Sequence, residues 1–288
     1  MVFSNRKLLM NNQLYIQIPL DASYFLKSEF QIDRLLDFCD WSSPASDNDV
    51  RQAVELMVPT GCSKELIRIG GSGDGAYLLP DDLTAIDACF SPGISTLVNF
   101  ELQLAEDFGI PSYLCDASVD CDQLQLNPEK QFFCRKWLGS SDGDDTQSLD
   151  QWVLGSDHAD SENLLLQMDI EGAEYRSLLS ASDSVLKRFR IVVVEFHMLP
   201  FLQSSRFLNN SFLPVLHKLL RRFDCVHAHA NNCLPLVDLA GYMVPQVIEL
   251  SFYRKAENQG PKNPWSSHSL DVVNVPTFPQ VVLGAPWV

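Results

Sequence analysis

The sequence predicts an α/β fold built on a mostly parallel sheet. Residues 164–168 and 191–197 are short apolar runs that end in polar groups, which is typical of strands buried on both faces of a sheet. From Leu66 onward, patterns of strand, loop and helix follow one another, as in crossover units between parallel strands. With 288 residues, the chain is long enough for one such domain and an N-terminal extension.

The first sixty residues do not show this succession. Residues 16–18 read as a short strand, and residues 30–39 and 48–57 carry the apolar spacing of helices. The stretch at residues 41–48, with proline, serine and aspartate, is typical of a loop. We therefore expect residues 1–60 to be an extension, helical with a short strand.

A first crossover unit follows at residues 88–116. Residues 88–90 form a strand, and apolar residues recur at helical spacing over residues 97–108 until Gly109 ends the helix. Residues 112–115 form the next strand, which ends at Asp116.

The second half of the chain completes the predicted sheet. A short helix at residues 174–180 follows the strand at 164–168. Ser211 is placed to cap a helix that runs to Arg222, with Pro214 in its first turn. Residues 225–230 and 246–253 add strands, which could form an antiparallel edge. We expect the domain to span residues 61–255, with an irregular tail at residues 256–288 packed on it.

Composition excludes several classes of protein. The formal net charge of −16 and the pI near 4.6 disfavour binding to nucleic acid, which requires clustered lysine and arginine. No apolar run is long enough to span a membrane, and residues 1–20 lack the order of a signal peptide. The eight cysteines contain no C-x-x-C pair, which favours reduced thiols over disulfides or zinc. These features predict a cytoplasmic protein.

Acidic groups follow two of the buried strands. Asp169 and Glu171 come after the first, and Glu195 and His197 end the second. Such groups can act as general bases or as ligands of a hard divalent ion. The alternatives are helix capping by Asp169 or Glu174 and a histidine at the rim of the core.

Three further motifs could contact ligands. Gly93 and Asp116 are 23 residues apart, as a turn and strand end that hold a nucleoside would be, although no G-x-G-x-x-G loop is present. A tight turn and a surface aspartate are the alternative.

The glycine-rich segment at residues 68–77 could hold an anion, but we favour a hairpin. His227 and His229 share one strand face and could bind metal or substrate, with acid partners from the strand that contains Glu249, or could be exposed.

Several blocks together resemble the FkbM family of S-adenosylmethionine-dependent methyltransferases. The resemblance covers residues 66–253, and the D-x-E-G-A-E block is its most specific part. One departure is Pro92 before the single Gly93, where many methyltransferases have several glycines. The blocks are M-D-I-E-G-A-E at 168–174, V-E-F-H at 194–197, R-I-G-G at 68–71, D-G-A-Y at 74–77, S-P-G-I at 91–94 with Phe100 and Glu101, and residues 227–232 and 248–250.

This resemblance implies a class I methyltransferase fold, Rossmann-like and three-layered, with a seven-stranded sheet whose last strand is antiparallel. It implies S-adenosyl-L-methionine as cofactor and methyl transfer to a hydroxyl of a small molecule, such as a sugar of a glycan or of a glycosylated metabolite. The residues expected to bind the cofactor are Gly70, Asp74, Ser91, Gly93, Glu101, Asp116 and Asp169, and those expected to be catalytic are His197, Asp169 and Glu171.

An alcohol that accepts a methyl group needs a base. His197 is the first candidate and Asp169 the second. A divalent metal is the alternative means of acidifying the hydroxyl, because the related macrocin-type sugar methyltransferases hold magnesium with acids at these strand ends; here these would be Asp169 and Glu195. The rival functions are a nicotinamide-dependent oxidoreductase, which the missing pyrophosphate loop disfavours, and a catalytically silent protein of the same fold that binds a carbohydrate or a partner.

Overall fold

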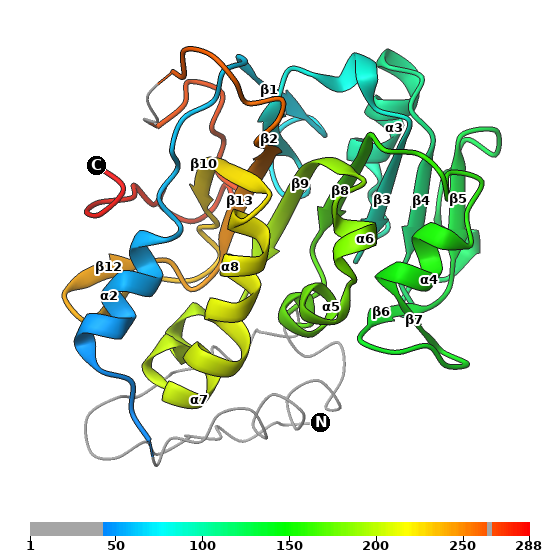
Figure 1. Ribbon diagram of the computed structural model, residues 1–288. Coiled ribbons are helices and arrows are strands. Elements are labelled where there is room, and N and C mark those ends of the chain that lie inside the picture. The colour runs from blue at the N-terminus through cyan, green and yellow to red at the C-terminus, as the bar shows by residue number, and fades with distance from the viewer. Residues whose placement is uncertain (1–42, 264–266) are drawn as a thin grey trace.

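The computed structural model describes residues 43–263 and 267–288. At its centre is a seven-stranded sheet with the order β10-β13-β9-β8-β3-β4-β5 (Figure 1). The predicted strand at residues 16–18 and helix at 30–39 lie outside the described residues. The strands of this sheet are β3 (Ala88–Pro92), β4 (Ser112–Cys115), β5 (Gln131–Cys134), β8 (Leu164–Met168), β9 (Phe189–Phe196), β10 (Phe223–Ala230) and β13 (Ile248–Arg254).

Five strands of the sheet, β5, β4, β3, β8 and β9, are parallel to one another. The last strand, β13, is antiparallel to both β9 and β10. This arrangement confirms the predicted mostly parallel sheet with an antiparallel last strand. The two strands expected to complete the sheet, β10 and β13, form an antiparallel pair at one edge, with β13 between β9 and the outermost strand β10.

The two faces of the sheet are covered differently (Figure 1). Helices α4, α5 and α8 pack on one face and form the larger core, whereas α3 and the β1–β2 hairpin cover the other. On β9, Val194 points into the larger core and Val193 into the smaller one. Since side chains alternate along a strand, Glu195 faces the side of α3 and the hairpin.

The remaining elements mostly agree with the sequence prediction. The helices predicted at residues 48–57 and 174–180 correspond to α2 and α5, and the glycine-rich segment connects the antiparallel hairpin β1–β2. The bounds are α2 (Asp47–Glu55), α3 (Asn99–Asp107), α4 (Leu149–Leu154), α5 (Glu174–Ser180), α6 (Asp183–Leu186), α7 (Ser205–Phe207), α8 (Leu213–Leu220), β1 (Leu66–Ile69), β2 (Tyr77–Pro80), β6 (Trp137–Gly139), β7 (Thr146–Ser148), β11 (Val237–Leu239) and β12 (Tyr242–Val244).

The helix predicted to begin at Ser211 begins earlier. Helical backbone runs from α7 through a π-helical segment, Leu208–Phe212, into α8, and Ser204 caps its start through a hydrogen bond from the backbone N–H of Phe207. Pro214 lacks a backbone N–H, and its ring crowds the preceding turn. The wider π turn accommodates this proline inside the helical run, where the N–H of Leu213 bonds to the carbonyl of Leu208.

Two predictions from composition can be compared with the described residues. The seven cysteines in these ranges have free thiols, which agrees with the expectation of reduced cysteines. In the same ranges, every helix is too short or too polar to cross a membrane.

The segment at residues 267–288 is irregular and packs against β10 and β13. Asp271 Oδ1 lies 3.0 Å from Nε2 of His227 and 3.7 Å from Nδ1 of His229. The side chain of Asn232 binds the segment at four points: its amide donates to the carbonyls of Val275, Phe278 and Pro279, and its oxygen accepts from the N–H of Val275. Trp287 completes the attachment by inserting into the larger core.

We predict that acid loosens this segment. Burial lowers the pKa of His229, and the bond from His227 lowers the pKa of Asp271 although burial opposes that shift. A depressed folded-state pKa stabilises the fold above the unfolded value and loses that effect as pH falls through the folded value. As the pH falls, the stabilising effect of the neutral His229 imidazole is therefore lost first, below about pH 6.5. That of the ionised Asp271 carboxylate is lost only below about pH 3.9.

Limited proteolysis of the segment at pH 7.5 and pH 5.5 measures this effect. We expect cleavage to accelerate at the lower pH in the wild type and to change less in His229→Gln, which has no titrating imidazole. Equal acceleration in both proteins would show that His229 is not responsible.

Candidate active site

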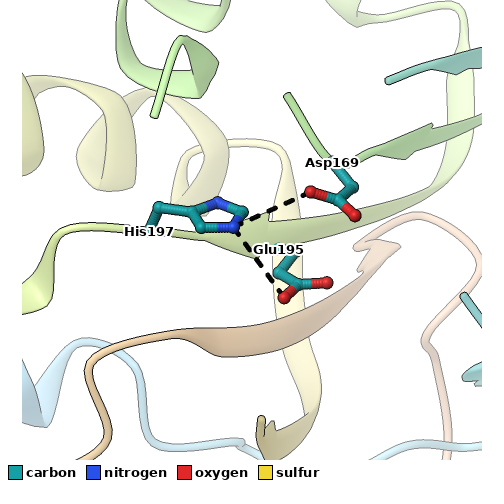
Figure 2. A group of neighbouring side chains, drawn as sticks. All are labelled: Asp169, Glu195 and His197. Atoms are coloured by element: carbon teal, nitrogen blue, oxygen red, sulfur yellow. Dashed lines mark ion pairs between the residues drawn. The ribbon is translucent and has the colours of Figure 1, made fainter. Parts of the chain in front are cut away.

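Asp169, Glu195 and His197 meet at the carboxyl ends of β8 and β9 (Figure 2). The two strands are parallel, and Met168 is the register partner of Val194, so the residues that follow lie side by side. His197 Nε2 lies 3.8 Å from Asp169 Oδ1 and 3.9 Å from Glu195 Oε1. The structure thus brings together groups that the sequence placed only at the ends of two separate strands.

The orientation of His197 depends on Glu174, at the start of α5. Glu174 is fully buried, and its Oε1 accepts the backbone N–H groups of Ile170 and Gly172, each at 3.1 Å. The same oxygen lies 3.0 Å from Nδ1 of His197. Because Nδ1 faces Glu174, Nε2 faces the opposite side, toward Asp169, Glu195 and Glu171, whose Oε2 is 3.4 Å away.

Glu171 adopts a backbone conformation that is uncommon for a residue with a side chain. Its φ is 55°, and the following Gly172 has a φ of 99°. Left-handed backbone at a non-glycine residue is uncommon and clusters at functional sites. Here it belongs to the turn that carries Glu171 from the end of β8 toward the imidazole of His197.

The protonation of the cluster follows from burial and from crowding of charges. Burial raises the pKa of Asp169 and of Glu195 well above their ordinary values. Burial opposes the charged form of His197, but the carboxylates of Glu174 and Glu195 outweigh it and raise the imidazole pKa well above its ordinary value. His197 therefore holds a proton among the acids, and can act as a base only after that proton has left.

Two residues from other elements hold Glu195. The amide of Asn231, at the end of β10, donates to Oε1 at 2.8 Å, and the hydroxyl of Tyr77, in β2, donates to Oε2 at 3.4 Å. The sequence analysis named neither Asn231 nor Tyr77 as a site residue. The only signal for Asn231 was its position in the block that resembles family members.

Gly93 forms the link between the end of β3 and this cluster. Its φ is 87°, and a Cβ at this position would lie 1.5 Å from the carbonyl oxygen of Asp169. The sequence suggested that this glycine admits a ligand. The structure gives a different reason for it, namely that the turn after β3 packs directly on the backbone after β8.

Asp116 lies beside this turn, as predicted, since the N–H of Gly93 bonds to the carbonyl of Cys115. Asp116 is buried, and its Oδ1 accepts from the backbone N–H of Ser118 at 2.6 Å and from the hydroxyl of the same residue. The strand ends of β3 and β4 therefore form a second polar group that adjoins the acidic cluster through Gly93.

The other residues expected to bind cofactor occupy varied positions. The N–H of Gly70 donates to the side chain of Gln103 in α3, and Asp74 accepts from Asn274. Asp74 also contributes to the raised pKa values of Asp169 and Glu195, so it lies in their vicinity. Ser91 and Glu101 are buried and in contact with each other.

His227 and His229 are not part of the acidic cluster. Their rings are stacked with centroids 6.5 Å apart, and both are buried against Asp271. The expected acid partner, Glu249, is instead bound by Asn274. The pair is buried rather than exposed, because a segment from a distant part of the sequence covers it, while Glu249 of β13 is the register partner of His229.

Strand β13 is inserted antiparallel beside β9, and the polar site lies at the carboxyl ends of the parallel strands. Together these features define a class I methyltransferase fold. The family model described as "Methyltransferase FkbM domain" matches residues 120–226, which include Asp169, Glu195 and His197. Residues 120–226 thus match an FkbM methyltransferase domain, and a domain of this family implies an S-adenosylmethionine-dependent methyltransferase. The chain has no significant match among curated proteins.

The contact between Gly93 and Asp169 leads to a stability prediction. We expect Gly93→Ala to lower the free energy of unfolding by more than about 3 kcal/mol, because the methyl group meets a backbone carbonyl and the φ is left-handed. Gly71→Ala is the matched control, since Gly71 has a φ of 89° and open space around it, and should cost about 1 kcal/mol. Urea denaturation measures both, and equal losses would refute the close contact.

Proposed function

We propose that the protein transfers a methyl group from S-adenosylmethionine to a hydroxyl oxygen of a small, uncharged polyhydroxylated molecule such as a sugar. The observation that carries this proposal is the cluster of Asp169, Glu195 and His197 next to the Gly93 turn. The cofactor would lie over the ends of β3 and β4, and the acceptor over the ends of β8 and β9. The methyl group would pass between them near Asp169.

For the cofactor, we assign direct contacts to Gly93 and Asp116. Carboxylates at the end of the second strand of such a fold can accept hydrogen bonds from ribose hydroxyls. Gly70 and Asp74 would border the same region from the hairpin loop. Ser91 and Glu101 are buried beneath it, which supports an indirect role for them.

The charge of the cluster supports an uncharged acceptor. Asp74, Asp169, Glu195 and Glu249 influence one another electrostatically, and His197 and Arg68 are positive groups beside them. The acidic groups outnumber the positive ones, so they would repel a phosphate or carboxylate on the acceptor, and the cation proposed below would offset only part of their charge. Hydroxyl groups, by contrast, are good partners for carboxylate oxygens.

We further propose that the cluster holds a divalent cation. Asp169, Glu195 and His197 each offer a ligand atom, and these atoms lie within 4.8 Å of one another. Asp169 Oδ1 accepts no hydrogen bond from the described residues, and Glu174 orients the imidazole as the carboxylate behind a metal-bound histidine does. The imidazole of His197 would have to lose its proton to bind the ion. The two carboxylates suit Mg²⁺ or Mn²⁺. A bound cation would lower the pKa of the acceptor hydroxyl.

The protein residues would then position the reactants and receive one proton. S-adenosylmethionine, when bound, would supply the methyl group and keep the electron pair of the broken carbon–sulfur bond on sulfur, and the protein would hold the acceptor oxygen in line with that bond. The hydroxyl proton passes to a carboxylate, for which we assign Glu171, because the turn directs it toward the same space as His197 Nε2. Asn231 and Tyr77 keep Glu195 in place during the reaction.

Cofactor binding tests the proposal directly. We expect S-adenosylhomocysteine to bind the wild type in a calorimetric titration. Asp116→Ala should lower the affinity by about tenfold or more, as the loss of a hydrogen-bonded carboxylate does, whereas His197→Ala should leave it within about twofold because that residue would act on the acceptor side. No heat from the wild type at millimolar ligand would refute the proposed function.

Cation binding is tested separately, with Mn²⁺ as the probe and electron paramagnetic resonance as the readout. We expect one bound ion in the wild type and none in His197→Ala. Glu174→Gln should bind about 10–100-fold more weakly, since it supports rather than supplies a ligand. Glu106→Gln, an exposed change on α3, is the control. Unchanged Mn²⁺ binding in His197→Ala would exclude this site.

A further inference from the structure

A further buried polar group, formed by Ser91, Gln167 and Glu101, lies between β3, β8 and α3. Ser91 is fully buried on β3, Gln167 is buried on β8 and Glu101 is buried in the first turn of α3. Ser91 Oγ is within hydrogen-bonding distance of Glu101 Oε1 and lies 2.6 Å from Gln167 Oε1. One hydroxyl group therefore stands between two oxygen atoms that normally accept hydrogen bonds.

The number of hydrogen atoms limits how these contacts can form. A serine hydroxyl donates one hydrogen bond, and an amide oxygen donates none. If Ser91 donates to Gln167, the contact with Glu101 is a hydrogen bond only when the carboxyl group of Glu101 carries a proton. The surroundings agree with this, since burial raises the pKa of Glu101 and the bond with Ser91 offsets that only in part.

We propose that Glu101 is a neutral carboxylic acid in the folded protein and acts as a positioning residue for the cofactor turn. Its hydroxyl donates to Ser91, and Ser91 donates to Gln167. This chain of hydrogen bonds joins α3 to the ends of the two strands that lead into the site. Ser91 is two residues before Gly93, and Gln167 is two residues before Asp169. The hydrogen bonds therefore hold the ends of β3 and β8 in position just before the turns that contain Gly93 and Asp169.

A neutral acid is suited to this position. An ionised carboxylate would require a cation or several donors once removed from water, whereas the described contacts of Glu101 are one hydroxyl and its own backbone N–H, and no cation. As a neutral donor it satisfies Ser91 at no cost in buried charge. In the opposite arrangement, the side-chain amide of Gln167 is flipped and its NH₂ group donates to Ser91. Ser91 then donates to Glu101, which is ionised.

Infrared difference spectroscopy at pH 8 distinguishes the two arrangements. Subtracting the spectrum of Glu101→Gln from that of the wild type should show the loss of the C=O band of a protonated carboxyl group. Glu106→Gln, on the same helix but exposed, should show the loss of carboxylate bands instead. Carboxylate bands lost in Glu101→Gln would overturn the proposal. Ser91→Ala gives a second test, in which the C=O band should shift rather than disappear.

The positioning role rests on the proposed function and is tested by binding of S-adenosylhomocysteine. Glu101→Gln can still donate to Ser91 and should bind within about twofold of the wild type, whereas Glu101→Ala leaves the buried hydroxyl without its donor and should bind about tenfold more weakly. A tenfold loss in Glu101→Gln, or none in Glu101→Ala, would overturn the role. If the wild type fails to bind, the proposed function fails, while the infrared result still decides the protonation of Glu101.

Discussion

The packing of the Gly93 turn against the backbone of Asp169 is the contact on which the rest of the site depends. It joins the end of β3 to the end of β8 with no side chain between them, and Gly93 also bonds to the end of β4. Three strand ends are therefore held at fixed separation by backbone atoms alone. The side chains that carry chemistry are then placed by the register of neighbouring strands, which parallel pairing makes continuous.

On this frame, the protein maintains an arrangement of charge that would be unstable in isolation. Four carboxylates surround one imidazole, and most of these groups are removed from water. Such a cluster persists only because backbone N–H groups, Asn231 and Tyr77 supply donors from several elements. Strained and electrostatically costly groups of this kind are common where a protein binds ions or performs catalysis.

Local pattern was enough to predict the elements whose burial follows a regular period along the sequence. Strand β8 and helix α5 were predicted with their observed bounds. An apolar run and a helical spacing can both be recognised from residues that are close together in the sequence. The start of the helix at Ser204 was missed because a proline inside a helix normally ends it, and a π turn is invisible in the sequence. The contact of His227 with Asp271, and that of Gly93 with Asp169, could not be predicted, since each joins residues far apart in the chain.

The insertion of β13 between β9 and β10 has a consequence for biosynthesis. Strand β9 is complete at Phe196, but the strand that pairs with its free side ends at Arg254. During translation, the backbone N–H and C=O groups of β9 and β10 that pair with β13 therefore stay unpaired until about sixty residues after β9 have been made. The sheet is complete only when the last strand has been made, so a chain that terminates before β13 would leave the free side of β9 and both sides of β10 unpaired.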